Sequence, residues 1–465
     1  VPCPWHLTPA LRRVGVAVPG HQPRVKGVRN YWYLRMSDLD GACRAAHLPA
    51  PETPLDTATI AAIATPPGEG GIGVVRISGP DAADIAGRIF HRAGRKRPLD
   101  LRAVESHRLL FGTVVDPATQ QPVDEVLLAW MAGPHTYTRE DTVELSCHGG
   151  PVPLQETLRL ALAAGARHAE PGEFTLRAFL NGRLDLTQAE AVLNVIGART
   201  AESLRLAVSD LAGDLTRRLE PANAALISLL AYLDASADFP DDEIETADIA
   251  TGLRAAREAL EDVVAGSKAG MLYRDGARIA LVGRPNVGKS SLLNALLRAE
   301  RAIVTPIAGT TRDVIMETIN LRGIPATLLD TAGIVETDDV VERIGVERSR
   351  DALRTSAAVV LVLDGSEPPQ DGDLDIVRAL AERPADERTP VVIAINKADL
   401  PQVGQGRATD LLPDATIVHL SATTGEGLKT LEDALAGVLG SASAQPAMIT
   451  ARQRAAVDRA LAHIE

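Results

Sequence analysis

The chain has 465 residues, which is enough for about three domains of ordinary size. Its hydrophobic fraction of 45% and charged fraction of 23% are those of a soluble globular protein, and no apolar stretch approaches the roughly 18 residues that cross a bilayer. The formal net charge of -13 argues against a protein that coats nucleic acid through bulk electrostatics, so any RNA contact must be local or shared with a partner.

Residues 1–53 differ in composition from the rest of the chain. They carry only basic charges before the first acid, Asp38, but they contain no serine before Ser37, unlike a transit peptide, and no long apolar core, unlike a signal peptide. We expect a poorly ordered extension, or an upstream start with Met36 as the true beginning. The cysteines Cys3, Cys43 and Cys147 show no metal spacing, which favours a reducing compartment.

Residues 54–173 predict an α+β domain. Turn-rich segments separate short runs with the apolar content of strands, and one stretch has helical periodicity. The strands are expected at 60–64, 73–77, 109–115, 125–131 and 142–146, and the helix at 81–90.

Long helices are expected over 174–274. Leu211, Leu215 and Leu219 are spaced by four, and Leu226, Leu229, Leu230 and Leu233 extend the stripe, as in the core of a helical bundle. The acidic run 238–245 contains Pro240, which predicts the end of a helix and a solvated loop.

Strands and helices alternate over 275–441, which predicts a mostly parallel, doubly wound sheet. The apolar run 279–282 continues directly into a P-loop, Gly283 to Ser290, with the pattern Gly, four residues, Gly-Lys-Ser. Its glycines allow backbone N–H groups to surround phosphate, Lys289 reaches the terminal phosphates, and the Ser290 hydroxyl suits a magnesium ion. From Ser291 the leucines have helical spacing, which places the phosphates at a helix N-terminus.

A guanine preference follows from Asn396-Lys-Ala-Asp399, after the predicted strand 391–395. The Asp399 carboxylate can accept two hydrogen bonds from guanine, whereas adenine would leave it unpaired. We expect Lys397 to cover the base, Asn396 to tie this loop to the P-loop, and Ser421-Ala422, after the strand 416–420, to complete the base pocket.

Two further segments suit the γ-phosphate. Asp330-Thr-Ala-Gly333 follows the predicted strand 326–329, and Gly309-Thr-Thr-Arg-Asp313 offers the Thr311 hydroxyl to magnesium. Ile334 stands where Ras-like enzymes have the glutamine that orients water, and no arginine finger can be assigned. Catalysis must therefore recruit another group.

Residues 442–465 are expected to return to the helical domain. The stretch 448–465 reads as a polar-faced helix, and it stops without a cap, so we expect the bundle to continue beyond it.

The chain resembles the tRNA-modification GTPase family MnmE, also called TrmE. Besides the nucleotide motifs, the likeness rests on ATPPGEGGIGVVRISG (64–79), YTREDTVELSCHGG (137–150) and PGEFTLRAFLNGRLDLTQAEAV (171–192). The resemblance implies a multidomain α/β protein, with a folate-binding N-terminal domain that forms a homodimer, a helical domain, and a G domain inserted into the helical domain. The G domain would be 275–441.

The resemblance also implies roles for individual residues. Glu342, in DDVVERIG, would align the attacking water, and potassium would replace the arginine finger, with ligands at Asn286, Thr305, Ile307 and Thr310. Magnesium would be held at Ser290 and Thr311, and 5-formyl-tetrahydrofolate at Arg76, Glu144 and Arg183. The residues expected to contact GTP are Asn286, Val287, Gly288, Lys289, Ser290, Ser291, Thr305, Pro306, Ile307, Ala308, Gly309, Thr310, Thr311, Asp330, Thr331, Ala332, Gly333, Asn396, Lys397, Asp399, Ser421, Ala422 and Thr423.

The implied activity is GTP hydrolysis coupled to aminomethyl-type modification of the tRNA wobble uridine. It would require an FAD-bearing MnmG-type partner in a heterotetramer, in the cytoplasm, with the mitochondrial matrix as the alternative. Family members end in a Cys-x-Gly-Lys tail that this chain lacks, which places the modification step in doubt. A GTPase switch of ribosome assembly, like the Era or Der group, is the competing hypothesis, although such proteins carry basic RNA-binding modules.

Overall fold

The structure is a computed structural model that describes residues 57–94, 99–238, 248–300, 317–330, 355–383, 389–404, 406–440 and 446–464. The chain divides into two compact units, Val1–Ala189 and Glu190–Glu465, and each is treated by itself. The predicted extension 1–53 lies outside the described residues. Among the helices of the described ranges, none has the length and apolarity needed to cross a membrane.

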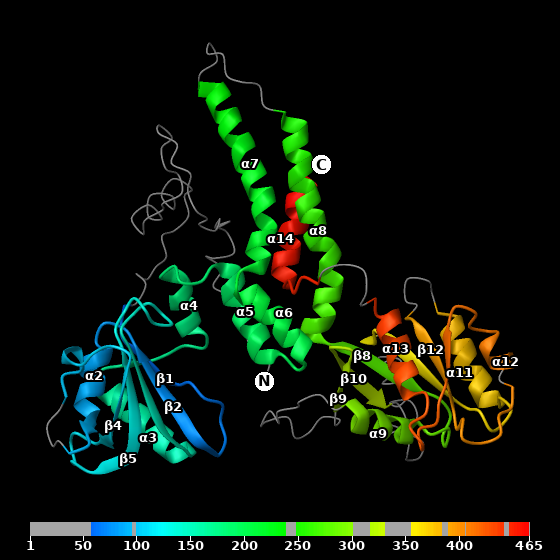
Figure 1. Cartoon of the computed structure of the whole chain (residues 1–465), viewed down its shortest axis with the longest axis horizontal. Helices are drawn as coiled ribbons and strands as arrows, with labels where there is room; N and C mark the ends of the chain where they lie inside the picture. Colours follow the sequence, from blue (N-terminus) through cyan, green and yellow to red (C-terminus); the bar gives the residue numbers. More distant parts are fainter. Residues whose placement is uncertain are drawn as a thin grey trace, which may run out of the picture. The chain divides into compact units, whose positions relative to one another are not determined.

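Unit 1 is built on a seven-stranded sheet with the order β3-β4-β5-β6-β2-β1-β7. All pairs are antiparallel except β1 with β7. Helices α2 and α3 pack against one face of the sheet, where the buried cluster includes Ile85, Phe90 and Leu145 (Figure 1). The predicted α+β class is confirmed. The elements are β1 Ile60–Ile63, β2 Gly70–Ser78, α2 Ala82–Ile89, β3 Phe90–Arg92, the short 3-10 helix η1 Leu101–Ala103, β4 Arg108–Val115, β5 Pro122–Met131, β6 Thr142–Gly149, α3 Pro151–Ala163, β7 Arg167–His168 and α4 Glu173–Leu180.

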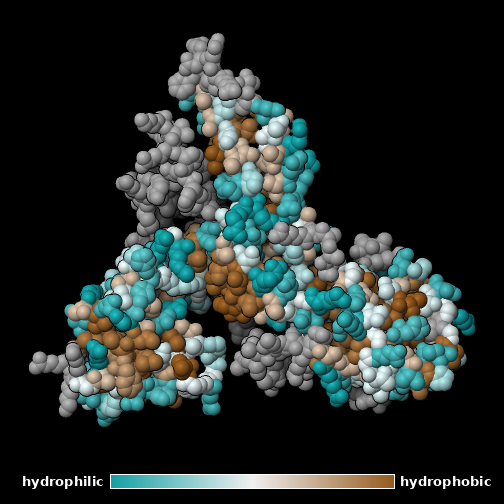
Figure 2. Space-filling model, viewed as in Figure 1, coloured by the Kyte–Doolittle hydropathy of each residue, from teal (hydrophilic) through white to brown (hydrophobic). Residues whose placement is uncertain are grey.

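The opposite face of this sheet carries exposed apolar side chains. Strand register places Val74, Ser146, Leu127 and Phe111 in one row across β2, β6, β5 and β4. Phe111 is 54% exposed and Leu127 is 43% exposed. Apolar side chains also gather over the strands of this unit in Figure 2.

Unit 2 contains a helical stem. Its α7 packs along α8, and α14 packs on α8. Small side chains of α7 and α8, Ala222 and Ala256, are buried with Val457 of α14. The helices are α5 Leu186–Gly197, in which the unit boundary falls, α6 Ala201–Leu211, α7 Asp214–Asp238, α8 Ile249–Asp275 and α14 Ala451–Ile464.

The predicted leucine stripe is only partly correct. The chain turns between α6 and α7 at Gly213, which has φ +89, so Leu211 and Leu215 lie on different helices. Leu215 and Leu229 are buried, but Leu230 and Leu233 are 54% and 49% exposed. These two lie near the end of α7, past the residues that pack in the buried cluster with α8 and α14. Of the predicted acidic run 238–245, Asp238 is the last residue of α7, and residues 239–245 lie outside the described part of the chain.

The second part of unit 2 is a six-stranded sheet with the order β13-β12-β11-β8-β10-β9. All pairs are parallel except β9 with β10, which confirms the predicted doubly wound sheet. Helices α9 and α13 cover one face, and α11 and α12 cover the other. The elements are β8 Ala277–Val282, α9 Lys289–Glu300, β9 Glu317–Leu321, β10 Ile324–Asp330, β11 Ala358–Asp364, α11 Asp371–Ala381, β12 Val391–Asn396, α12 Gly406–Thr409, β13 Thr416–His419 and α13 Leu428–Val438.

Candidate functional site

The P-loop joins β8 to α9 at the carboxyl edge of the parallel strands, next to the point where the strand order reverses. At two positions of the loop, neighbouring atoms leave no room for a side chain, so only glycine fits. Gly283 has φ +154, and a Cβ there would lie 2.4 Å from the Val362 carbonyl oxygen. Gly288 has φ +99, and its Cβ would lie 2.2 Å from the Asn396 amide nitrogen. Any side chain at either position would push the loop away from its neighbours.

Lys289 is held at the base of the loop. Its ammonium group donates hydrogen bonds to the carbonyl oxygens of Gly283 and Arg284, both at 2.7 Å. The side chain is only 5% exposed. The positive charge is therefore fixed under the backbone that would surround a phosphate.

Asn396 joins three loops at the end of β12. Its amide nitrogen donates to the Val287 carbonyl at 2.9 Å, and its amide oxygen accepts from the Ala422 N–H at 3.0 Å. The tie between this asparagine and the P-loop that the sequence predicts is thus present. One side chain holds the phosphate loop and both base-side loops in a common geometry.

The neighbouring residues of the base-side loops are anchored as well. Lys397 has φ +62, and its ammonium group donates to Asp364 at 2.5 Å. Burial acts to raise the pKa of Asp364, but hydrogen bonds from Lys397 and Ser366 outweigh it and hold that pKa below its usual range. The Ser421 hydroxyl donates to the exposed Asp399 carboxylate at 2.5 Å. Sequence reasoning missed Asp364, because no local motif links it to Lys397.

Several residues assigned from the sequence lie outside the described part of the chain. These are the proposed catalytic Glu342, the segment 305–311 and the segment 331–333. Asp330 is described as the last residue of β10, without its side chain. Ser290, Ser291, Asn286 and Thr423 are exposed around the described loops.

A second cluster lies in unit 1 on the open face of the sheet. Arg76 of β2 and Glu144 of β6 are direct cross-strand partners, and their side chains form an ion pair at 2.7 Å. The Arg76 guanidinium lies 5.5 Å from the centre of the Tyr137 ring and 5.4 Å from that of Phe174. Arg183 stacks on the same tyrosine at 4.7 Å. The three residues predicted for folate are therefore brought together.

Tyr137 and Phe174 were missed as site residues. Both stand inside the quoted motifs, but a sequence gives no sign that they would stack on arginines from distant segments. The Tyr137 hydroxyl also bonds the Thr175 hydroxyl at 2.9 Å, which fixes the ring against α4.

A buried arginine anchors this cluster. Arg177 of α4 is 6% exposed and pairs with Glu140 at 3.1 Å and Glu173 at 3.0 Å. It also donates to the Ala58 carbonyl at 2.8 Å. Burial acts to raise the pKa of Glu173, but hydrogen bonds, first among them those from Arg167, keep that pKa low. Arg177 thereby holds α4 against the loop that carries Tyr137.

A family model described as the GTP-binding protein TrmE N-terminus matches residues 59–183, and one described as the MnmE helical domain matches residues 186–465. The tRNA modification GTPase MnmE of Chloroflexus aurantiacus is 50% identical over 407 residues, covering 86% of this chain and 87% of that protein. The tRNA modification GTPase MnmE of Roseiflexus castenholzii is 51% identical over 424 residues, covering 87% and 88%. The chain belongs to the MnmE family.

Membership of the MnmE family makes the chain a tRNA modification GTPase, as the sequence resemblance implied. Among solved structures, that of Aquifex aeolicus Era bound to GDP.AlF4- is 30% identical, covering 36% of this chain and 58% of that chain, with a TM-score of 0.28. The alternative function, a GTPase switch of ribosome assembly like Era or Der, is therefore not better supported than tRNA modification.

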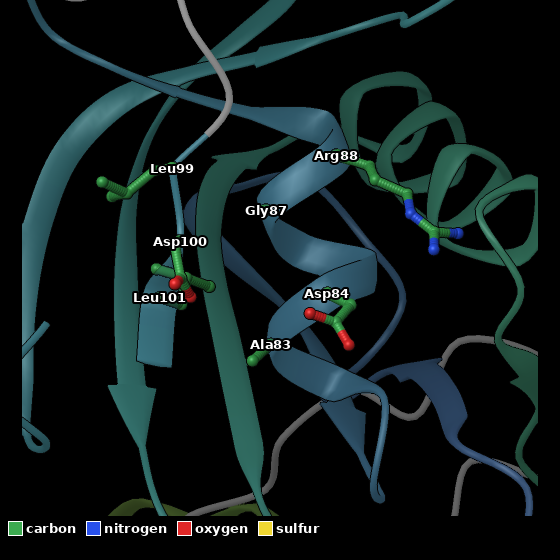
Figure 3. Close-up of a pocket in the computed structure, with 7 residues that line it drawn as sticks. All are labelled: Ala83, Asp84, Gly87, Arg88, Leu99, Asp100 and Leu101. Atoms are coloured by element: carbon green, nitrogen blue, oxygen red, sulfur yellow. The ribbon is translucent and has the colours of Figure 1, made fainter. Parts of the chain in front are cut away.

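One further depression lies in unit 1 between α2 and the segment 99–101. Figure 3 shows it lined by Ala83, Asp84, Gly87, Arg88, Leu99, Asp100 and Leu101. Its charged groups already have partners. Asp84 accepts from Arg102 at 2.8 Å, Arg88 donates to the Ala164 carbonyl at 2.9 Å, and Asp100 accepts from the Arg102 N–H at 3.0 Å.

The described residues contain no group of three or more histidine, cysteine or acidic side chains that could hold a metal ion. The oxygen donors at the P-loop, the Ser290 hydroxyl and the Asn286 amide, suit hard cations that complete their shells with phosphate oxygens.

Proposed function

We propose that this chain is a potassium-stimulated, homodimeric GTPase that acts with an FAD-bearing MnmG-type partner on tRNA in the cytoplasm. With 5-formyl-tetrahydrofolate it would install an aminomethyl-type group on the wobble uridine. The observation that carries the proposal is the presence, in one MnmE-family chain, of the Asn396-centred nucleotide site and the Arg76 cluster.

The nucleotide site supports GTP as substrate. The Ser421 hydroxyl holds Asp399, which would accept hydrogen bonds from guanine. Asp364 holds Lys397, which would lie along the base, and the Gly283 carbonyl holds Lys289, which would face the phosphates. In this proposal Glu342 aligns the attacking water, because Ile334 has no group that can do so.

The cation ligands are assigned from the family. Ser290 and Thr311 would hold Mg²⁺, and Asn286, Thr305, Ile307 and Thr310 would hold K⁺. These ions supply positive charge next to the phosphates, where charge develops during hydrolysis. Asn286 is exposed and has a φ of +68, and its side-chain amide oxygen could bind such an ion.

The Arg76 cluster supports a folate. Guanidinium and tyrosine planes stack well on flat rings, and arginines pair with carboxylates such as those of a folate tail. The exposed apolar row on the same sheet face, which includes Leu127 and Phe111, supports a second copy of unit 1 as the partner of this face.

Three measurements test the proposal. Calorimetric titration with 5-formyl-tetrahydrofolate should show binding that Glu144→Gln weakens, whereas Glu105→Gln, which alters an exposed pair with Arg108, should not. GTP hydrolysis should be faster in potassium than in sodium at equal ionic strength. Mass spectrometry of tRNA nucleosides from MnmE-deficient cells should show modified wobble uridine when the cells express the chain continued through a Cys-x-Gly-Lys tail. Absence of folate binding together with equal rates in the two salts would favour the assembly-GTPase alternative.

A further inference from the structure

Arg284, the second residue of the P-loop, directs its side chain to α11 and binds the N-terminus of that helix. Its Nε donates to the Asp373 carboxylate at 2.8 Å, and its Nη1 donates to the Gln370 side-chain oxygen at 2.8 Å. The Arg284 side chain is 19% exposed and that of Asp373 is 3% exposed. The pair is therefore largely withdrawn from water, where an ion pair is screened much less than at the surface.

The start of α11 is shaped to receive this arginine. The Asp373 carboxylate oxygen that binds Arg284 also accepts from the Gln370 N–H at 3.0 Å, as part of a capping box. A Cβ at Gly372 would lie 3.3 Å from the Arg284 Cδ, so the glycine leaves room for the side chain. The other Asp373 oxygen is buried and has no partner among the described residues. Arg284 is thus the main compensation for a buried charge.

The same residue supports the phosphate-binding lysine through its backbone. The Arg284 carbonyl oxygen accepts from the Lys289 ammonium at 2.7 Å. A continuous set of contacts runs from Asp373 through the Arg284 side chain and backbone to Lys289. Movement of Arg284 would change the position of the ammonium group beneath the phosphates.

We propose that Arg284 and Asp373 form a positioning pair for the P-loop. The pair fixes the Arg284 backbone and thereby the Lys289 ammonium, so it sets the affinity for the phosphates of both GDP and GTP. It does not touch the attacking water, so its loss should act on binding more than on the chemical step. The residues are 89 positions apart, beyond any local motif.

The first experiment compares Arg284→Met, which keeps most of the side-chain length, with Arg378→Met. Arg378 lies on the same helix α11 in an exposed pair with Asp375, so it is a matched control. The dissociation constant of a fluorescent GDP analogue, the KM and kcat for GTP, and Tm are measured on the full chain. Arg284→Met should weaken GDP binding and raise KM by about tenfold, with kcat changed by less than about threefold. The control should behave as the wild type.

Two further variants separate positioning from general stability. Arg284→Lys keeps the charge but loses the planar fork, so it should recover part of the affinity. The double variant Arg284→Met with Asp373→Leu replaces the ion pair by apolar groups. It should recover most of the Tm lost in Arg284→Met, because no buried charge is left unpaired and only the cap on the Gln370 N–H is missing. GDP affinity that stays low in this variant supports the proposal. Affinity that returns with Tm, or wild-type affinity in folded Arg284→Met, overturns it.

Discussion

Asp399 is the residue that the proposed function assigns to the choice of base. Its carboxylate is exposed, and its position is set by the Ser421 hydroxyl at 2.5 Å and by the loop that Asn396 ties to the P-loop. An ionised carboxylate only accepts hydrogen bonds, which matches the paired donors of guanine.

Asp399→Asn should therefore shift the preference from GTP towards xanthosine triphosphate, because the amide offers one donor and one acceptor. Competition between the two nucleotides for a fluorescent analogue measures this shift. Asp410→Asn, which changes another exposed aspartate of unit 2, serves as the control. Unchanged discrimination in Asp399→Asn would show that another group reads the base.

Asp210 of α6 is a buried carboxyl group that the nucleotide site does not use. Burial, together with the nearby charge of Asp214, raises its pKa to about 6, despite the opposing effect of Arg218. In the unfolded chain this carboxyl titrates near 4. Between these values the unfolded state releases a proton that the folded state retains, so stability falls as pH rises to about 6 and is lowest above it.

Asp210→Asn should raise the free energy of unfolding at pH 8 by about 1–3 kcal/mol, and the gain should vanish below about pH 4. Thermal unfolding of both forms between pH 4 and 8 measures it. Asp375→Asn, at an exposed position on α11, is the control. A gain that is independent of pH would mean that packing, and not the charge, is responsible.

The site residues that sequence could predict are those whose chemistry is written in a local motif. Lys289 and Asn396 are examples, because each stands in a short motif of fixed residue spacing, although Asn396 binds Val287 109 positions away. Tyr137, Phe174 and Asp364 were missed because each acts on a side chain from another segment. Only the strand register and loop packing bring such groups together.

At the scale of elements, hydrophobic spacing predicted the strands well and the helical stem less well. β8 and β12 are buried over nearly their whole length, so a continuous apolar run identified them. The leucines on both sides of Gly213 keep a helical spacing, which predicted one continuous helix. The chain instead turns at Gly213, whose left-handed backbone conformation cannot be recognised from the spacing of leucines. Leu230 and Leu233 fit the period but lie where the described helices do not cover them.

Close approach of backbone segments decides another feature of the stem. At Gly270 of α8, a Cβ would lie 1.9 Å from the Ala447 carbonyl oxygen, and the Ala447 N–H donates to the Gly266 carbonyl at 3.1 Å. The segment before α14 therefore crosses α8 at a glycine because only a glycine leaves room for it.

Gly270→Ala should destabilise unit 2 by about 2 kcal/mol or more, because the clash is with backbone and cannot be relieved by a rotamer change. Gly437→Ala is the matched control, since it lies in α13 with no heavy atom within 4 Å of the added Cβ. The control should be neutral or stabilise by up to about 1 kcal/mol. The midpoints of denaturant unfolding are measured for both variants. Equal midpoints would contradict the close approach of the segment before α14 to Gly270.

At the scale of the whole molecule, the nucleotide-binding sheet and the helical stem share a core. Leu206 of α6 and Tyr273 of α8 are buried in one cluster with strand residues such as Ile319. The Thr200 hydroxyl at the start of α6 donates to the Gly323 carbonyl in the turn between β9 and β10 at 2.5 Å. The sequence predicted that the long helices end near residue 274 and that alternating strands and helices follow. It could not show that one hydrophobic core continues across that position.

Nucleotide binding should therefore stabilise the stem as well as the sheet, but not unit 1. A ligand at 100 times its dissociation constant stabilises the folded state by about 2.7 kcal/mol, which slows exchange through global unfolding about a hundredfold. Hydrogen exchange with and without Mg·GDP should show this slowing in β8, β12, α6 and α8, and no change in β2 and β6. ADP at the same concentration is the control. Slowing confined to the sheet would mean that the shared core does not couple α6 to it, whereas equal slowing of β2 and β6 would mean that the two units unfold together.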